Sequence, residues 1–417
     1  MKKDSRVKAV ISLDAVEHNF REMRKNIAEE TKMIAVIKAD AYGHGAVPVA
    51  HLIEDYDYIW GFAAATAEEA IHLREAGITK PILILGIVFD EYFPELVRYE
   101  IRPAVCEYEE ARKLSDEAVL QKKTVHIHIA LDTGMTRIGF ADAQENVEEI
   151  KKISELPNLE IEGMFTHFAR ADEYDRSPAM VQLERYLDFS RRVEEAGVEI
   201  PLHHCSNSAG IIRMPEANLN IVRAGITIYG IYPSSEVERD IVKLEPVMEL
   251  KSHVTYVKDV PAGAAISYGG TYVADRKLRV ATVPVGYADG IHRSASGFNE
   301  AGSKHVNKPG APVRVMTRDG ARIFHVSGRV CMDQFILDLH GDAENMGVHI
   351  GDTVELFGPG RGEDYLEPTA DDWARAADTI SYEIFTCLRN RVPRLYANAF
   401  EVLDETDLGK LDQSTLL

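Results

Sequence analysis

Between about residue 32 and residue 230, one pattern of hydrophobic and polar positions repeats along the chain. A short aliphatic or β-branched run is followed by a longer stretch with helical periodicity and charged faces. Eight such runs occur: KMIAVIKA, YIWGFAAA, PILILG, IRPAVC, TVHIHIALD, LEIEGMFTHF, LHHCSNS and NIVRAGITIYG. Among the amphipathic stretches between them, PAMVQLERYLDFSRRVEEAG begins with Pro178 and closes with Gly197, as helices favour. Eight strand and helix units predict a TIM barrel.

After residue 240 the pattern changes. The runs KSHVTYVKDV, LRVATVPVG, ARIFHVSGRV, QFILDL and DTVELFG follow one another without long helices and with Gly and Pro between them. One helix is predicted at TADDWARAADTI, where Thr369 and Asp372 have the spacing of a capping box. We expect an α/β fold: a TIM (β/α)8 barrel over residues 1–240, then a mainly β C-terminal domain over residues 241–417. The first strand, near residues 8–14, is a candidate to pair with the second domain.

The length, composition and charge of the chain argue against several classes of protein. With 417 residues the chain exceeds one usual domain, and no apolar run reaches the length of a membrane span. The basic opening MKKDSRVKAV is not followed by an apolar signal core, so we expect a cytoplasmic protein. Its four cysteines are irregularly spaced, which favours reduced thiols. A formal charge of -20 argues against binding to nucleic acid.

In a TIM barrel the functional residues lie at the carboxyl ends of the strands. Several predicted strands end in residue types that carry catalysis, so the sequence predicts a site at this rim. The residues concerned are Lys38, Arg137, Thr166, His167, Ser206, Asn207, Ser208 and Arg223.

Lys38 and Arg223 have the most specific chemistry among them. Lys38 follows the apolar run MIAVI, and desolvation beside cations favours a neutral amine that can form a Schiff base. The alternative is a solvated lysine at a strand end.

Arg223 lies inside NIVRAGI, so its permanent charge must be paired or used. A structural ion pair is one interpretation. Beside a pyridine ring, it would instead keep the ring nitrogen unprotonated and weaken the ring as an electron sink.

Two further features fit a phosphate-bearing group and a second base. Ser208, Gly225 and Ile226 fall after the seventh strand and at the eighth, where barrels commonly bind phosphate. A helix cap at Ser208 and a packing glycine explain the same residues equally well. Tyr268 of ISYGGTY stands among small residues and could act as a general base, although a plain strand aromatic is the commoner case.

In this order, VIKADAYGHG, LDTGMTRIGF, THFA, SNSAG, VRAGITIYG, ISYGGTY, VPVGYADG, GRVCMDQ and TISYEI resemble the alanine racemase family, and the likeness spans almost the whole chain. The resemblance implies a pyridoxal 5'-phosphate enzyme that interconverts L-alanine and D-alanine and supplies D-alanine for peptidoglycan. It also implies a homodimer in which the partner subunit completes each active site. A serine or broad-specificity racemase is the nearest alternative, although a bulky phenol at Tyr382 leaves little room beyond a methyl group.

The resemblance assigns a role to each matching residue. Lys38 resembles the lysine that holds the cofactor and acts as one base, and Tyr268 of the second subunit resembles the opposed base. His167 and Arg223 resemble residues linked to that tyrosine by hydrogen bonds, with Arg223 also facing the pyridine nitrogen. The residues similar to the phosphate-binding group are Tyr42, Ser208, Gly225, Ile226 and Tyr382. Arg137 and the Met332 backbone amide resemble the anchors of the substrate carboxylate, and Tyr287 resembles an entrance residue.

The chain departs from the family pattern at three places. Ala130 stands where many relatives carry a lysine, often carbamylated, which leaves open what orients Arg137. Thr136 stands where glycine is usual. The segment between Gly290 and Gly328 is longer than usual, and its polar run HRSASGFNEAGSKHVNKPGAPV suggests a surface loop near the entrance or the dimer interface.

Two other functions compete with the racemase interpretation of this sequence. The barrel histidines could indicate a metallohydrolase, but His126 and His128 lie too far from the end of their strand to line the mouth, and no metal ion is expected. The other histidines of that rival site would be His167, His203 and His204. A non-catalytic cofactor-binding protein built from the barrel alone is disfavoured by the second domain.

Overall fold

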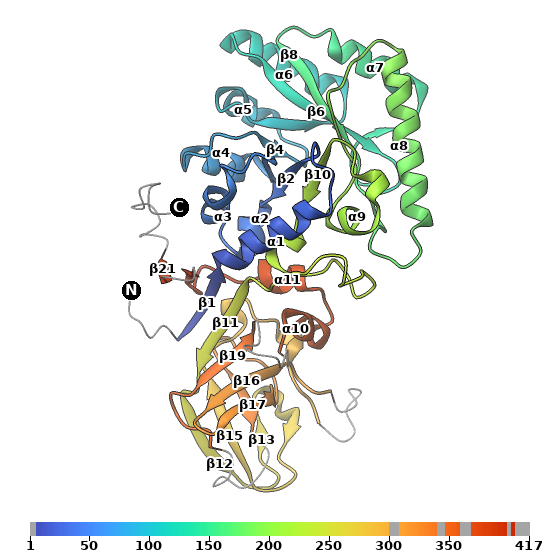
Figure 1. Cartoon of the computed structure of the whole chain (residues 1–417). Coiled ribbons are helices and arrows are strands. Elements are labelled where there is room, and N and C mark those ends of the chain that lie inside the picture. The colour runs from blue at the N-terminus through green and yellow to red at the C-terminus, as the bar shows by residue number, and fades with distance from the viewer. Residues whose placement is uncertain (1–5, 300–307, 340–346, 359–367, 398–401, 405–417) are drawn as a thin grey trace. The chain divides into compact units, whose positions relative to one another are not determined.

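The computed structural model describes residues 6–299, 308–339, 347–358, 368–397 and 402–404 (Figure 1). The chain forms two compact units. One consists of Val16–Glu245 and is called the barrel unit below. The other consists of Met1–Ala15 and Pro246–Leu417 and is called the β unit.

The barrel unit is built on eight parallel strands, and each of the eight predicted runs supplies one of them. They are β2 (Lys32–Val36), β3 (Ile59–Ala64), β4 (Ile82–Ile84), β5 (Arg102–Val105), β6 (Val125–Asp132), β8 (Leu159–Phe165), β9 (Leu202–His204) and β10 (Ile221–Ala224). Their order in the sheet is β10-β2-β3-β4-β5-β6-β8-β9, with the short β7 (Phe140–Ala141) beside β6. The two ends of the sheet meet where Arg223 N donates to Ser206 O at 3.0 Å. The predicted TIM barrel is confirmed.

Helices surround these strands (Figure 1). They are α2 (Lys38–Gly43), α3 (Ala46–Ile53), α4 (Ala67–Glu75), α5 (Phe93–Arg98), α6 (Tyr108–Gln121), α7 (Gln144–Ser154), α8 (Ser177–Glu195) and α9 (Ser208–Arg213), preceded by α1 (Leu13–Lys25), which contains the boundary between the units. Helix α8 illustrates why these segments of the barrel unit form helices. Pro178 opens it, and Leu183, Tyr186 and Phe189 are buried on one face. Each such side chain contributes about 1.5 to 3 kcal/mol by leaving water.

The described residues of the β unit form three sheets. The largest has seven strands in the order β17-β16-β19-β11-β1-β20-β21, the second has the order β12-β15-β18, and the third pairs β13 with β14. The strands of the first are β17 (Gly320–His325), β16 (Pro312–Thr317), β19 (Thr353–Phe357), β11 (Met248–His253), β1 (Val7–Ser12), β20 (Arg394–Ala397) and β21 (Val402–Asp404). Those of the smaller sheets are β12 (Tyr256–Val260), β15 (Leu278–Val283), β18 (Phe335–Asp338), β13 (Ala265–Ile266) and β14 (Tyr272–Val273). The early strand β1 thus lies antiparallel to β11.

Two helices complete the β unit, α10 (Ala370–Ala377) and α11 (Ser381–Thr386). The capping box predicted for α10 is present, because Thr369 and Asp372 exchange hydrogen bonds between side chain and backbone. Trp373 of α10 is 1% exposed, and its ring nitrogen donates to Pro312 O at 2.9 Å. Phe385 of α11 packs edge-on against Phe357 of β19, with ring centroids 5.7 Å apart. The two helices therefore close over the core of this unit.

Several described elements were not predicted from the sequence, among them α11, β16 and β20. Helix α11 has six residues, too few to show helical periodicity. Strand β16 begins at Pro312, inside the polar run that suggested a surface loop, and β20 follows Pro393. The expected surface loop differs from the structure in its described part, since Ala295 and Ser296 are buried and Ser296 Oγ accepts from Val330 N at 2.9 Å. Residues 300–307 of that run lie outside the described residues.

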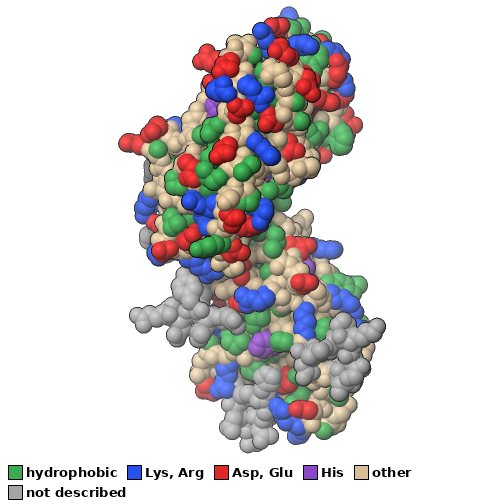
Figure 2. All heavy atoms as spheres, turned by 90° about the vertical axis from the view of Figure 1, so that its right-hand side faces the viewer, with side chains coloured by type: hydrophobic (Ala, Val, Ile, Leu, Met, Phe, Trp, Pro, Cys, Tyr) green, Lys and Arg blue, Asp and Glu red, His purple; other side chains and the backbone are tan. Residues whose placement is uncertain are grey.

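The surface carries charges of both signs. Figure 2 shows acidic and basic side chains interspersed over the visible face of each unit. Across the described parts of the chain, no helix combines the length and the apolar character needed to cross a bilayer.

Candidate active site

A cavity of about 230 Å³ lies at the carboxyl ends of the barrel strands. Its charged and polar lining comes from the residues that the sequence placed at this rim: Lys38, Arg137, Thr166, His167 and Arg223. The apolar part of the lining includes Ala65, Leu85, Ala130 and Phe165. The structure therefore brings the predicted barrel residues with cationic or imidazole side chains to one cavity.

The turn after Lys38 has an unusual backbone. All four residues from Ala39 to Tyr42 have φ between 50° and 54°, which makes one left-handed turn. This conformation costs roughly 1 to 2 kcal/mol per residue for L-amino acids, so surrounding contacts must hold it. Glu69 supplies two of them, because its carboxylate accepts from Ala39 N at 2.7 Å and from Ala65 N at 2.8 Å. Asp40 supplies a third by accepting from Ala46 N at 2.8 Å.

The electrostatic setting of Lys38 favours its neutral form. Burial lowers the pKa of the Lys38 ammonium, and the positive charges of Arg137 and Arg223 lower it further, although Glu69 opposes them. Burial and the same arginines also lower the pKa of His167, to about 3, so this imidazole is neutral at physiological pH. The effect on Lys38 is the one that the sequence predicts for an amine at an apolar strand end beside cations.

Arg223 is 2% exposed, and both terminal nitrogens of its guanidinium donate hydrogen bonds. Its guanidinium donates to the carbonyl oxygens of His204 at 2.7 Å, Thr166 at 2.7 Å and Cys205 at 3.1 Å. It also donates to Nδ1 of His204 at 2.8 Å and of His167 at 3.2 Å. Among the described residues no carboxylate pairs with it, so the alternative of a structural ion pair does not hold. Burial lowers the pKa of Arg223 to about 10, and the group stays cationic at neutral pH.

A buried chain of polar groups extends from Arg223 through the barrel, and the sequence did not reveal it. An arginine can only donate, so Nδ1 of His204 accepts and its Nε2 carries the proton. That Nε2 lies 2.8 Å from Nδ1 of His128, whose own Nε2 lies 3.3 Å from the Glu162 carboxylate. Glu162 in turn accepts from Arg102 at 2.9 Å. The direction of every proton in this chain is thus set by the two arginines at its ends.

Local strand geometry makes room for His128. The pairing of β6 with β8 shifts register between Ile127 and His128, which re-aims the following side chains. Opposite the imidazole lies Gly163, where a Cβ would stand 2.4 Å from His128 Nδ1. The glycine within LEIEGMF was the one signal in the sequence for this close approach.

The phosphate-binding residues that the resemblance places in the barrel unit, which leaves out Tyr382, meet near the ends of β9 and β10. Ser208 Oγ accepts from Gly225 N at 2.9 Å and from Thr227 Oγ1 at 3.0 Å, which leaves its own proton to donate. A Cβ on Gly225 would lie 3.2 Å from Tyr42 Oη and 3.6 Å from Ser208 Oγ, so the glycine keeps a small cradle open. Ile226 begins the turn η3 (Ile226–Tyr229). The cap of α9 is Asn207, which accepts from Gly210 N, rather than Ser208.

The loop that carries Arg137 is organised by Asp132. Its carboxylate accepts from Gly134 N at 2.9 Å and from Thr136 N at 3.0 Å. Thr136, which stands where glycine is usual, has φ of 55°. Ala130 is buried in a small cluster with Ala104 and Phe165. In place of the lysine of many relatives, this corner of the cavity therefore has an apolar wall.

The remaining predicted residues lie in the β unit, mostly exposed. The exposed fractions are 66% for Tyr268, 52% for Met332 and 37% for Tyr287, and Tyr382 is half-buried on α11. Their segments are joined by hydrogen bonds: Ser267 Oγ donates to Arg329 O at 2.5 Å, and Ala288 N donates to Met332 O at 2.9 Å. ISYGGTY, VPVGYADG and GRVCMDQ thus form one cluster that presents two tyrosines and a backbone segment to the outside.

The barrel histidines do not form a metal centre among the described residues. His128 and His204 bond to each other and to the chain described above, His203 bonds to Tyr186 Oη at 2.9 Å, and His126 faces Glu160 at 3.3 Å. His128, His203 and His204 therefore have hydrogen-bond partners in the barrel, whereas His126 Nδ1 makes no hydrogen bond with a described residue.

Comparison with known proteins agrees with this architecture. Residues 11–233 match the family model "Alanine racemase, N-terminal domain", and residues 247–396 match "Alanine racemase, C-terminal domain". Alanine racemase 2 of Caldanaerobacter subterraneus subsp. tengcongensis is 40% identical over 403 residues, which cover 96% of this chain and 97% of that protein. The solved alanine racemase of Clostridium difficile 630 has a TM-score of 0.87 at 39% identity and covers 97% of this chain and 98% of its own. The Bacillus anthracis alanine racemase, solved with bound L-Ala-P, has a TM-score of 0.84 at 33% identity and covers 98% and 100%.

A TIM barrel with a cationic cavity at its mouth, followed by a mainly β unit, defines this protein as an amino-acid racemase of the barrel type, an isomerase. The chain belongs to the alanine racemase family, whose cofactor is pyridoxal phosphate. The family predicted from nine motifs is confirmed. The rival interpretations as a barrel metallohydrolase and as a non-catalytic cofactor-binding protein are wrong, since the family models span both units and the relatives are enzymes of this one kind.

Proposed function

We propose that this chain is a pyridoxal-phosphate-dependent alanine racemase with two opposed bases, Lys38 and Tyr268 of the partner subunit. The observation that carries the proposal is the convergence of Lys38, His167, Arg223 and Arg137 on one cavity in the barrel unit. We further propose that it works in the cytoplasm as a homodimer and supplies D-alanine for peptidoglycan.

The residues present fit the cofactor. The cradle at Gly225 offers the Ser208 hydroxyl and the backbone amide of Ile226, and burial raises the pKa of Tyr42 to about 12, which keeps that phenol a hydrogen-bond donor. Tyr382 would add a hydroxyl from the β unit. These groups would hold the phosphate, and the Lys38 amine would hold the aldehyde carbon. When bound, the cofactor supplies an electron-withdrawing ring that shares the charge left by the departing α-proton.

Arg223 sets how strongly that charge is shared. Its guanidinium is held by carbonyl oxygens and imidazoles and stays cationic at neutral pH, so it can only donate. A pyridine nitrogen facing it would remain unprotonated, which weakens charge sharing. A short-lived carbanion favours racemisation over side reactions because the proton returns quickly.

Lys38 and Tyr268 divide the proton transfers between the two faces of the substrate. A lowered pKa leaves more Lys38 amine neutral, which suits it to accept the α-proton on its own face. His167 accepts from Arg223 at Nδ1, so its Nε2 carries a proton that it can donate to the phenolic oxygen of Tyr268 of the partner subunit. One base removes the α-proton, and the other returns a proton to the opposite face. In the reverse reaction the roles exchange.

The exposure of Tyr268 supports the proposal that this residue acts in the active site of the partner subunit. With 66% of its surface exposed, the ring lacks the burial expected of a structural aromatic. Hydrogen bonds of the Ser267 hydroxyl with Arg329 O and Cys331 Sγ nevertheless hold its segment beside the Met332 segment. An exposed tyrosine held beside the Met332 segment is what a partner's active site requires.

Arg137 and the Met332 amide would hold the substrate carboxylate. In the absence of a lysine at Ala130, the Asp132 carboxylate positions Arg137 through the loop backbone, by its bonds to Gly134 N and Thr136 N. Loop geometry thus takes over the positioning that a neighbouring side chain performs in many relatives.

The test compares wild type with Lys38→Ala and Tyr268→Phe over a panel of amino acids that includes alanine and serine. Lys38→Ala should lose both the visible absorbance of bound cofactor and racemisation. Tyr268→Phe should keep the absorbance and lose racemisation, while α-proton exchange with deuterated solvent persists for one enantiomer only. Alanine should react faster than serine, with partial selectivity because one hydroxyl is hard to exclude. Two variants with unchanged absorbance and rates would contradict the proposal.

A further inference from the structure

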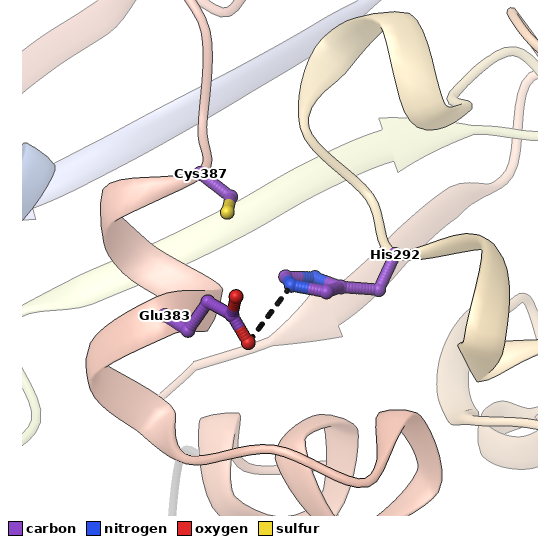
Figure 3. Close-up of side chains that lie close together, drawn as sticks. All are labelled: His292, Glu383 and Cys387. Atoms are coloured by element: carbon purple, nitrogen blue, oxygen red, sulfur yellow. Dashed lines mark ion pairs between the residues drawn. The ribbon is translucent and has the colours of Figure 1, made fainter.

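Three side chains with metal-binding atoms meet in the β unit, apart from the residues assigned to the reaction. They are His292, Glu383 and Cys387, whose potential ligand atoms all lie within 4.8 Å of one another (Figure 3). Figure 3 shows the imidazole and the carboxylate pointing toward each other, with the thiol on the same side of the helix end. His292 Nε2 and Glu383 Oε2 are 3.5 Å apart.

The local structure brings these groups together for definite reasons. Glu383 lies in α11 and Cys387 caps its carboxyl end, so a spacing of four residues places both on one face. The segment leading to His292 is held against them by backbone. Gly290 has φ of 105°, and a Cβ there would stand 2.1 Å from Cys387 O. Arg389 N also donates to Asp289 O at 3.1 Å.

The site has the further features of a ligand set. Cys387 is a free thiol, and Thr379 Oγ1 donates to the Glu383 carboxylate, which fixes its orientation. The His292 side chain is 17% exposed and that of Glu383 is 52% exposed, so one side of the group is open to solvent. An ion can therefore enter, and water can complete its coordination.

We propose that His292, Glu383 and Cys387 bind one divalent ion of the zinc class. One nitrogen, one sulfur and one carboxylate oxygen suit a borderline-soft ion, whereas Mg²⁺ and Ca²⁺ select oxygen ligands alone. Bond lengths of about 2.0 to 2.3 Å in a tetrahedron put ligand atoms roughly 3.3 to 3.8 Å apart. The observed group needs only a small contraction to reach this spacing, and the exposed Glu383 side chain can supply it.

Binding would connect two segments that the proposed function uses. Tyr382 precedes Glu383 in α11, and Tyr287 lies on the segment that leads to His292. An ion bound between these two segments would restrain both of them. Its binding would therefore change the turnover rate from a position outside the cavity of the barrel unit. The ion itself takes no part in the proton transfers.

No pattern in the sequence indicates this group of three side chains. His292 is separated from Glu383 and Cys387 by the whole of the strands from β16 to β19, so no spacing motif links them. Only the folded β unit brings them together.

The test uses purified holoenzyme, stripped of adventitious ions with a chelator and titrated with Zn²⁺ and with Co²⁺. We expect one ion per chain, visible d–d absorbance of tetrahedral Co²⁺ with thiolate charge transfer, and no binding of Mg²⁺. Cys387→Ser should weaken Zn²⁺ binding at least about 100-fold and abolish the thiolate band. Glu383→Gln, at an exposed position, is a second variant with little risk to folding and should weaken binding about tenfold or more.

Cys106→Ser is the matched control, because Cys106 is another half-buried free thiol, in the barrel unit. It should bind Zn²⁺ like the wild type. The proposal is overturned if stoichiometric binding is absent, or if Cys387→Ser and Glu383→Gln bind as tightly as Cys106→Ser. Since the readout is metal binding, neither outcome depends on whether the two-base mechanism is correct.

Discussion

A single buried carboxyl gives the barrel unit a pH-dependent stability. Glu110 in α6 is 6% exposed, and burial raises its pKa to about 7, although the Cys106 amide donates to it at 3.1 Å. Between the usual carboxyl pKa of 4.5 and about 7, the folded state keeps a proton that the unfolded state has released. Its stabilising contribution is therefore complete below pH 4.5 and is lost as the pH rises through 7, by up to about 3 kcal/mol.

Glu110→Gln, which cannot ionise, should remove this loss. The melting temperature of the variant relative to wild type should rise steadily between pH 5 and pH 8. Glu109→Gln changes an exposed neighbour on the same helix and should leave the profile unchanged. A constant difference between Glu110→Gln and wild type at every pH would show that Glu110 does not titrate in this range.

Backbone strain at Thr136 is a second effect of one residue. A β-branched side chain at φ of 55° costs about 1 to 3 kcal/mol, and glycine relieves it while losing about 0.5 to 1 kcal/mol of chain entropy. Thr136→Gly should therefore stabilise the protein by about 1 kcal/mol, seen as a small rise in melting temperature. Thr136→Ala keeps the Cβ and should bring much less of this gain. Equal stabilisation by both substitutions would mean that the backbone there is unstrained.

At the scale of elements, five barrel strands contribute to one polar chain from Arg102 through Glu162, His128 and His204 to Arg223. His128→Leu should interrupt it and leave Arg223 less firmly oriented. We expect kcat to fall about tenfold, or about 1.4 kcal/mol, with KM and cofactor absorbance nearly unchanged.

His126→Leu is the matched control, since His126 lies on the same strand but at the partly exposed end near Glu160. It should retain wild-type kcat. Glu162→Gln offers a milder interruption of the chain, because the amide keeps an acceptor for His128. Wild-type kcat in both His128→Leu and Glu162→Gln would show that the chain serves packing alone.

The eight barrel strands and the polar residues at or near their carboxyl ends could be predicted from the sequence, but the polar chain could not. Runs such as KMIAVIKA show a buried strand and its polar end directly, and this placed Lys38 and Arg223 at the cavity. The side chain of His128 is directed into the core because the pairing of β6 with β8 shifts register beside it. This shift depends on two strands that are separate in the sequence. Asp132 and Glu69 were missed for a similar reason, because their partners are backbone amides that no side-chain pattern reveals.

At the scale of the whole molecule, the residues that the proposed function uses come from both units. The barrel unit supplies the cavity with Lys38, and the β unit presents Tyr268 and Met332 at its surface. If the partner subunit provides the tyrosine, a chain in which one base is removed can still contribute its other base to an active site of the dimer. Two inactive variants would then complement each other in a mixed dimer.

The most direct measurement is the racemase activity of a mixture of Lys38→Ala and Tyr268→Phe chains, unfolded together and refolded, or co-expressed. In a mixed dimer, one site has lost both bases and the other keeps both. Random pairing makes half of the dimers mixed, so the account predicts recovery of about a quarter of wild-type activity from two inactive proteins. If mixed dimers form and activity stays at the level of the separate variants, Lys38 and Tyr268 do not act across the subunit boundary, and the two-base account is contradicted.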